Sequence, residues 1–203
     1  MRATITTRSL QLIGCAANPT AAGARARLFG FFFNAGDSIL ASLVNEVFAG
    51  VQVARFSNST DPAGVFRIAA FTGMCSDENC FTSVSLGGVE LGTVALNTPA
   101  AVQMTWDAAN NRFTFQLNAT TPVHLPYTVA DTFPAAFPSK RIEVSNTVPR
   151  CTATTRPVSF LRADFDNVMV NTSALSARAP TLAAPADATM MEPDGDEMIG
   201  RVD

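Results

Sequence analysis

The clearest hydrophobic pattern in the chain lies between Ala100 and Asn118. Every second residue is apolar in both arms of this stretch, and the sequence Asp-Ala-Ala-Asn-Asn separates the arms. The positions that share the apolar face are Val102, Met104, Trp106, Phe113, Phe115 and Leu117. A period of two is the pattern of half-buried strands, and Asp and Asn favour turns. The stretch therefore predicts a β-hairpin whose apolar face is covered by a second sheet.

Similar short segments of strand character recur along the chain and are separated by turn residues. They are residues 3–13, 24–34, 46–56, 65–74, 81–86, 90–96, 122–129, 141–145 and 158–171. Strands of this length with turns at intervals of about 8–12 residues are typical of two-layer β-proteins. The chain is therefore predicted to be all-β, with two antiparallel sheets packed as a sandwich. The apolar residues between 40 and 47 have helical spacing, whereas those from 47 to 53 alternate as in a strand, so the structure of residues 39–45 stays open.

Several local features of these strands are also predicted. Gly87-Gly88 is expected to turn the chain, and the segment 130–139 is expected to be a corner packed by Phe133 and Phe137. Ile142 and Val144 are expected to point inward. In the last strand the apolar parity changes near residues 166–167, so we expect a bulge or bend there.

After Thr172 the composition changes to Ala, Pro, Asp and Met, and the periodicity ends. We interpret residues 1–172 as one sandwich domain and residues 173–203 as a flexible, disordered acidic tail. A packed C-terminal helix in part of this tail is the alternative. No apolar signal-peptide core follows the polar residues 2–8, so we expect a mature form or a piece of a longer protein.

Charge and hydropathy narrow the classes of function. The net charge is -3 and no basic stripe is present, which argues against nucleic acid as a partner. No apolar run approaches the ~20 residues that a transmembrane helix needs, so no membrane span is expected.

The four cysteines suggest disulfides. Cys75 and Cys80 bracket a short polar loop, whereas Cys15 and Cys151 lie far apart in turn-like sequence. Four cysteines allow three pairings, and we favour Cys75–Cys80 as a local staple and Cys15–Cys151 as a long-range link. This pairing places the chain in an extracellular, periplasmic or cell-surface setting. Four free buried thiols in a cytosolic protein are the alternative, and no second close Cys or His pair supports a zinc site.

Two stretches carry a resemblance to a known family. The run GTVAL…VQMTWDAANNRFTFQLN, followed late in the chain by FDNVMVN, resembles concanavalin A-like lectin/glucanase jelly rolls, including laminin-G-like domains. The resemblance covers roughly residues 3–171 and implies a jelly roll of two curved antiparallel sheets. It also implies glycan binding on the concave face or rim loops. The Glu-x-Asp-x-x-Glu triplet of the glucanase members is missing, because Glu46, Glu90 and Glu143 lie on different predicted strands.

Aromatic residues are the first candidates for a binding site, because an amphipathic ring can stack on a sugar. Tyr127 follows Pro126 in a loop-like stretch and is the better candidate. Trp106 is the second candidate, although its parity with Val102 and Met104 favours the core.

Acidic residues are the candidates for metal or acid–base chemistry. Asp164 and Asp166 are the one pair that shares a strand face, and they are candidate calcium ligands. Retaining glycoside hydrolysis needs two carboxyls about 5–5.5 Å apart, so the same pair is the candidate if the chain is a hydrolase. The oxygen-rich residues 77–79 are a weaker calcium candidate. The single histidine, His124, lacks the Gly-x-Ser-x-Gly elbow of a hydrolase triad.

These observations favour a non-catalytic extracytoplasmic recognition module that binds carbohydrate, with no cofactor except calcium. One alternative is a structural or adhesion subunit that binds another surface protein. The other is a polysaccharide-acting hydrolase.

Overall fold

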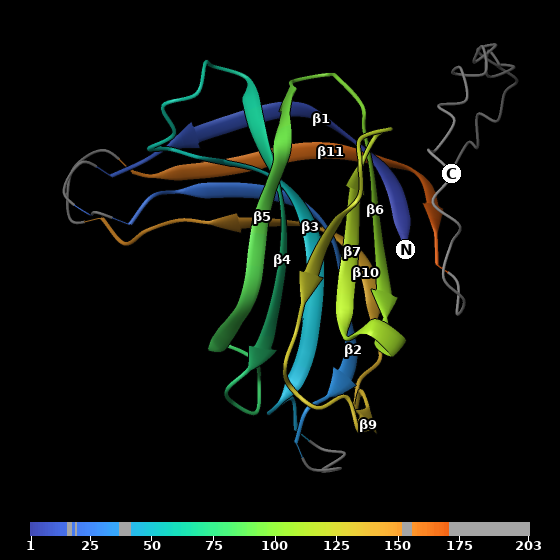
Figure 1. Cartoon of the computed structure of the whole chain (residues 1–203). Coiled ribbons are helices and arrows are strands. Elements are labelled where there is room, and N and C mark those ends of the chain that lie inside the picture. Colours follow the sequence, from blue (N-terminus) through green and yellow to red (C-terminus); the bar gives the residue numbers. More distant parts are fainter. Residues whose placement is uncertain (16–17, 19, 37–41, 152–155, 171–203) are drawn as a thin grey trace, which may run out of the picture.

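The computed structural model describes residues 1–15, 18, 20–36, 42–151 and 156–170, and they form two antiparallel sheets packed as a sandwich (Figure 1). The five-stranded sheet has the order β11 (Val158–Met169), β1 (Arg2–Ile13), β6 (Ala100–Asp107), β7 (Arg112–Leu117) and β8 (Val123–Pro126). The six-stranded sheet has the order β10 (Lys140–Thr147), β2 (Gly23–Asn34), β3 (Glu46–Phe56), β4 (Val65–Cys75) and β5 (Ser83–Ala95), and β9 (Phe133–Pro134) also pairs with β2. The predicted all-β sandwich is confirmed. The predicted tail at 173–203 and residues 39–41 of the open segment lie outside the described residues, whereas residues 42–45 form neither helix nor strand.

The predicted hairpin is formed by β6 and β7. A single 3-10 turn, η1 (Ala108–Asn110), joins the strands, and Asn111 closes it in the left-handed region at φ 46°. The register pairs Met104 with Phe115 and Trp106 with Phe113, so the apolar positions share one face. Met104, Phe113 and Phe115 have no exposed surface. The period-two pattern therefore does place these side chains in the core between the sheets.

Strand β2 supplies side chains to both faces of the six-stranded sheet. Ala24, Ala26 and Leu28 point into the core and are fully buried, so the alternate residues point away from the five-stranded sheet. We call this second face the outer face. A register shift between Phe31 and Phe33 adds one residue to β2, and Phe33 therefore returns to the core.

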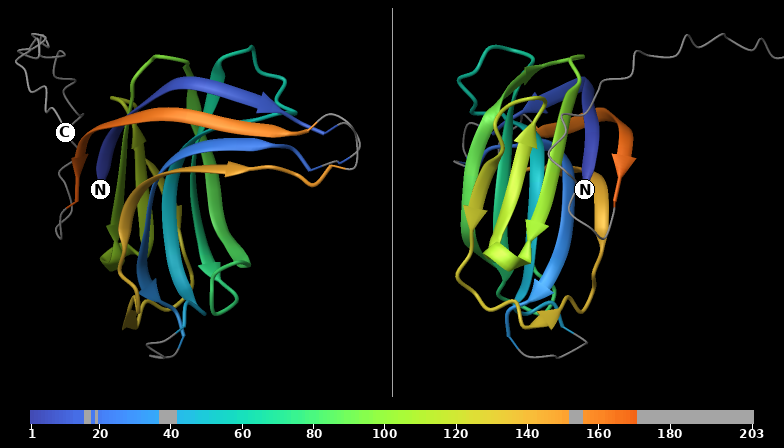
Figure 2. Two further views of the ribbon diagram at one scale, coloured as in Figure 1. Left: turned by 180° about the vertical axis from the view of Figure 1, so that it is seen from behind. Right: turned by 45° about the vertical axis from the view of Figure 1, so that its right-hand side comes forward.

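Four strands continue beyond the body of the sandwich as an arm. Figure 1 and Figure 2 show β1, β11, β2 and β10 running together to one side of the molecule. Cys15 and Cys151 lie at the tip and form a disulfide, with their Cα atoms 6.0 Å apart. The second disulfide joins Cys75 to Cys80. Both match the pairing favoured from the sequence.

The last strand contains the predicted bulge. Arg2 pairs with Met169 and Thr4 with Asp166, so β11 has one extra residue in this interval. Asn167 lies there with a φ of 51°, a conformation that Asn tolerates better than most residues. The change of apolar parity near residues 166–167 is therefore produced by a local bulge.

The predicted turn at Gly87-Gly88 is wrong, because both glycines lie inside β5. They pair with Thr72 and Phe71 of β4, and a register shift after Thr72 absorbs the irregularity. A bulge lets the strand continue where a turn would have broken the ladder.

The predicted aromatic packing of the corner at 130–139 is also wrong. Phe133 and Phe137 are 38% and 46% exposed, whereas Ala135 is buried. The corner is held by a hydrogen bond instead: the backbone N–H of Ala136 donates to Oε1 of the buried Glu46 at 2.7 Å.

Ile142 and Val144 lie on the core-facing side as predicted, but they are 39% and 38% exposed and are not buried. They pair with Leu28 and Ala26 of β2, so they do share the core-facing side. However, β10 is an edge strand, and its free flank leaves both side chains open to water.

Candidate functional site

The main candidate site lies on the outer face, and it begins with the alternation in β2. Arg25, Arg27, Phe29 and Phe31 are the residues between the core-facing positions, so they share the outer face. Strand geometry therefore sets two arginines and two phenylalanines in one row.

Two phenylalanines from neighbouring strands join this row. Phe48 of β3 and Phe71 of β4 have ring centroids 5.4 and 6.3 Å from that of Phe29. Phe31 meets Phe29 edge-on at 5.4 Å. We call these four residues the Phe cluster. Aromatic pairs at such separations contribute about 0.5–1.5 kcal/mol beyond the area they bury.

Two glycines allow the rings to lie low on the sheet. Gly50 pairs with Phe71 across β3 and β4, and Gly73 pairs with Phe48. A Cβ atom on Gly50 would lie 2.5 Å from Cζ of Phe71, and one on Gly73 would collide with the ring of Phe48. Both rings therefore cover backbone that only glycine leaves free.

The Cys75–Cys80 loop forms one wall beside the Phe cluster. The β2–β3 connection docks against it, because Leu43 N–H donates to Glu78 O at 3.0 Å and Asn45 N–H to Cys75 O at 2.9 Å. Within the loop, Asp77 accepts hydrogen bonds from the hydroxyl and backbone N–H of Thr82, and from two further backbone N–H groups. The Thr82 hydroxyl is the main reason that the pKa of Asp77 is lowered to about 2. The oxygens of Asp77 are therefore used to order the loop.

Three arginines form the other end of the site, and we call Arg25, Arg27 and Arg141 the arginine end. Arg141 and Arg27 lie over the ring of Phe29, with Cζ 4.7 and 5.6 Å from its centroid. Both also form ion pairs with Glu143, that of Arg141 at 2.8 Å. Three guanidinium groups against one carboxylate leave a local excess of two positive charges.

Arg25 has no carboxylate partner among the described residues. Its guanidinium lies 5.2 Å from the centroid of the Phe56 ring. Partial burial, and then the charge of Arg27, lower the pKa of Arg25. The Nε of Arg27 is buried and also has no hydrogen-bond partner within the described chain. The Arg25 guanidinium is therefore suited to an incoming anion.

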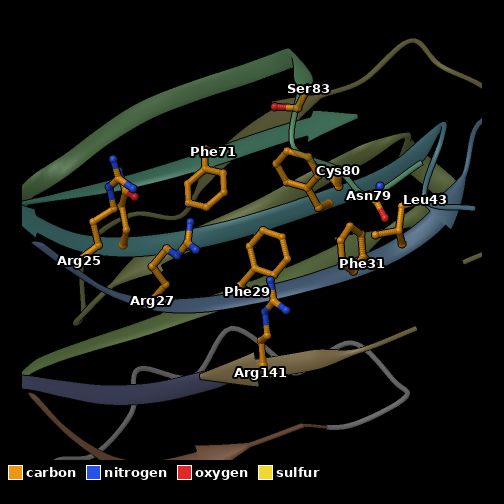
Figure 3. A pocket seen from close by; sticks show the side chains of 12 residues that line it. Arg25, Arg27, Phe29, Phe31, Leu43, Phe71, Asn79, Cys80, Ser83 and Arg141 are labelled. Carbon is orange, nitrogen blue, oxygen red and sulfur yellow. The ribbon is translucent and has the colours of Figure 1, made fainter. Parts of the chain in front are cut away.

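The Phe cluster and the arginine end line one pocket of about 520 Å³. Figure 3 shows Arg25 and Arg27 at one end, Leu43 and Asn79 at the other, and the rings of Phe29 and Phe71 between them. The rest of the lining is Phe31, Phe48, Gln52, Cys80, Ser83 and Arg141. An apolar floor with a few polar groups at its edges is the usual composition of a binding pocket. We call it the outer-face pocket.

The two aromatic residues predicted from the sequence lie elsewhere. Tyr127 is 5% exposed, and its ring contacts Phe33 and Phe113 in the core. Trp106 stacks on Phe33 at 5.4 Å and donates from Nε1 to the Tyr127 hydroxyl at 2.9 Å. The Tyr127 hydroxyl donates in turn to Asp131. Tyr127 is buried and Trp106 is half-buried, and both rings contribute to the packing of the core.

The acidic candidates are not gathered into a cluster. Asp164 forms an ion pair with Arg8 at 2.6 Å, and Asp166 is exposed beside the bulge. His124 shares a hydrogen bond with Thr114 at 2.9 Å. Among the described residues, no group of three or more His, Cys, Asp or Glu side chains is arranged to hold a metal ion.

Sequence reasoning missed the outer-face pocket, although one signal for it is present. The run Arg-Ala-Arg-Leu-Phe-Gly-Phe places both arginines and two phenylalanines at alternate positions. In a strand, such residues share a face. The contributions of β3, β4 and β10 depend on pairing between distant segments and carry no local signal.

Comparisons with known proteins add little. No protein-family model matches the chain, and no curated protein matches it. A search of solved structures finds the native heptameric SAP-like pentraxin from Limulus polyphemus. That alignment covers 81% of this chain and 88% of that chain, with 9% sequence identity and a TM-score of 0.22. A TM-score this low supports no functional conclusion.

In the part of the chain that is described, no helix is long and apolar enough to cross a bilayer.

Proposed function

We propose that this chain is a non-catalytic recognition module that binds carbohydrate in the outer-face pocket. The observation that carries the proposal is the combination, in one pocket, of an aromatic floor with hydrogen-bonding groups at its margin. Sugars present flat C–H surfaces and outward hydroxyl groups, and such a pocket complements both. The two disulfides are typical of oxidising compartments and fit an extracytoplasmic module.

In this proposal Phe71 supplies the apolar contact to the sugar, and the polar margin supplies the hydrogen bonds. The ring of Phe71 lies between β3 and β5, where it presents an apolar surface to the pocket. Gln52, Asn79 and Ser83 supply amide and hydroxyl groups around the floor. Amides and hydroxyls both donate and accept, as sugar hydroxyls require.

The test is thermal unfolding and calorimetric titration of the full chain against a panel of oligosaccharides. A ligand at about a hundred times its Kd stabilises the folded state by about 2.7 kcal/mol. For a chain of this size, that corresponds to a rise in Tm of roughly 5–10 °C. Phe71→Leu keeps the apolar volume but removes the aromatic face, so it should weaken binding. Phe160→Leu, on the other sheet, should not.

Two results would overturn the proposal. One is that no oligosaccharide raises Tm or releases heat. The other is that a saccharide binds equally well to the wild type and to Phe71→Leu.

A second candidate function, a structural or adhesion subunit, is favoured by the edge strand β11. Phe160, Val168 and Met169 of this strand are 52%, 43% and 43% exposed. An edge strand with exposed apolar side chains is a common pairing surface. Light scattering separates the two functions, because an assembly subunit should grow in size with concentration and Phe160→Ser should reduce that growth.

A further inference from the structure

A second pocket adjoins the outer-face pocket on the same sheet. It has a volume of about 350 Å³ and lies over β3 and β4, with Arg55, Phe56, Arg67 and Glu90 in its lining. Gln52 lines both pockets. The two hollows are therefore neighbours along the outer face and not separate sites.

The contacts between the pockets also make them continuous. The Arg25 guanidinium of the first pocket lies over the Phe56 ring, which belongs to the second. A molecule that touches Arg25 therefore lies next to both hollows.

The charges of the two pockets differ. At the arginine end, the positive charge of Arg25 is not compensated by a carboxylate in the described chain. In the second pocket Arg67 pairs with Asp61 at 2.7 Å and with Glu90 at 3.1 Å. The charges of the second pocket are thus largely neutralised within the protein. A ligand that suits both pockets carries an anionic group over the first and hydroxyl groups over the second.

From this arrangement we infer that the ligand is a linear acidic polysaccharide, with a carboxylate or sulfate at the arginine end and further sugar units extending past Gln52. The inference rests on the proposed carbohydrate function and names its ligand class. A single sugar fills only one pocket, whereas an oligomer covers the Phe cluster, Gln52 and the Phe56 side in sequence. Guanidinium groups bind carboxylates and sulfates through paired hydrogen bonds, so Arg25, which has no carboxylate partner in the described chain, sets the preference for acid.

The experiment is calorimetric titration with oligomers of a uronic acid of increasing length, and with neutral oligomers of the same lengths. We expect affinity for the uronate series to rise with length and then level off once both pockets are covered. Neutral oligomers should bind more weakly, by about tenfold or more, because they cannot form a charge-assisted hydrogen bond. Added salt should weaken only the uronate series.

Arginine variants test the acid preference. Arg25→Gln should weaken uronate binding by about ten- to a hundredfold and leave neutral oligomers nearly unchanged. Arg25→Lys, which keeps the charge, should fall between the wild type and Arg25→Gln and also guards against a folding defect. Arg162→Gln is the matched control, because it removes an exposed positive charge from the other sheet.

The outcomes separate this inference from the proposed function. Binding of neutral and acidic oligomers with equal affinity, unaffected by Arg25→Gln, would overturn the inference and leave the carbohydrate function standing. Equal affinity for a single uronic acid and for its long oligomers would overturn the two-pocket arrangement. Binding of acidic peptides as tightly as uronates would overturn the polysaccharide class. Absence of binding to any saccharide would refute both proposals.

Discussion

Replacing Gly50 by Ala is expected to destabilise the protein through a single ring. Gly50 lies opposite Phe71 in the β3–β4 ladder, and its added Cβ would lie 2.5 Å from Cζ of Phe71 and 3.0 Å from the carbonyl oxygen of Leu28. The carbonyl belongs to the neighbouring strand and cannot move away easily, so the ring must move. Overpacking of this kind costs about 1–3 kcal/mol.

Gly88 provides the matched control, because it lies opposite Phe71 on the other side, in β5. A Cβ atom there would meet nothing closer than the Ala70 carbonyl oxygen, at 3.5 Å. Gly88→Ala should therefore be neutral or should stabilise the fold by up to about 1 kcal/mol, because it restricts the unfolded chain.

Equilibrium denaturation of the wild type, both single variants and the double variant Gly50→Ala/Phe71→Ala measures these effects. If the ring is the obstacle, removing it relieves the clash, so the double variant should lose less stability than the sum of the two single losses. Strict additivity, or equal effects of Gly50→Ala and Gly88→Ala, would refute the account of why glycine occupies position 50.

The remaining predictions concern the disulfides and two ionisable groups. Loop-closure entropy predicts that loss of Cys15–Cys151, which spans 136 residues, costs about 5 kcal/mol of stability. Loss of Cys75–Cys80, which spans 5, should cost about 2 kcal/mol. Denaturation of the paired Cys→Ser variants measures both losses, and a larger loss for the short loop would contradict the prediction. Tyr127 is the only tyrosine, and burial raises its pKa to about 12, so its near-ultraviolet tyrosinate band should titrate well above the usual value of 10. Because the pKa of Tyr127 is higher in the folded than in the unfolded state, the stability that its protonated hydroxyl contributes is complete below pH 10 and is lost as the pH rises toward 12. Titration near pH 10 in the folded protein would show that the ring is not held in the core. The pKa of Asp77 is lowered to about 2, so its contribution is complete above its usual pKa of 3.8 and is lost as the pH falls toward 2. Carboxyl NMR titration checks this, with Asp77→Asn as the assignment control, and a midpoint at the usual value would contradict the hydrogen bonds to Thr82.

The sandwich could be predicted because its signals are local. Val102, Met104 and Trp106 alternate with smaller or polar residues over a few positions, and this is enough to assign a strand and its buried side. The change of parity at residues 166–167 is equally local, and it corresponds to the bulge at Asn167. In both cases the backbone geometry of a single strand determines which side chains face the core.

The candidate site could not be predicted because it depends on register between strands. Phe71 lies in the outer-face pocket because Gly50 faces it across the ladder, and these residues are distant in sequence. Tyr127 shows the reverse case. Its position after a proline suggested an exposed ring, but hydrogen bonds with Trp106 and Asp131 hold it in the core. Pairings of this kind are tertiary, and no property of the flanking residues indicates them.

The link between Cys15 and Cys151 has a mechanical consequence. Strands β1 and β11 form an antiparallel ladder that runs from Arg2–Met169 to Ile13–Val158, next to this link. Tension applied at Arg2 and Met169 would unzip the ladder pair by pair and then stop at the covalent bond. Every strand that lines the outer-face pocket lies inside the closed loop and would carry no load. The outer-face pocket should therefore survive tension that separates β1 from β11, and it should carry load only after a reducing agent has broken the disulfide.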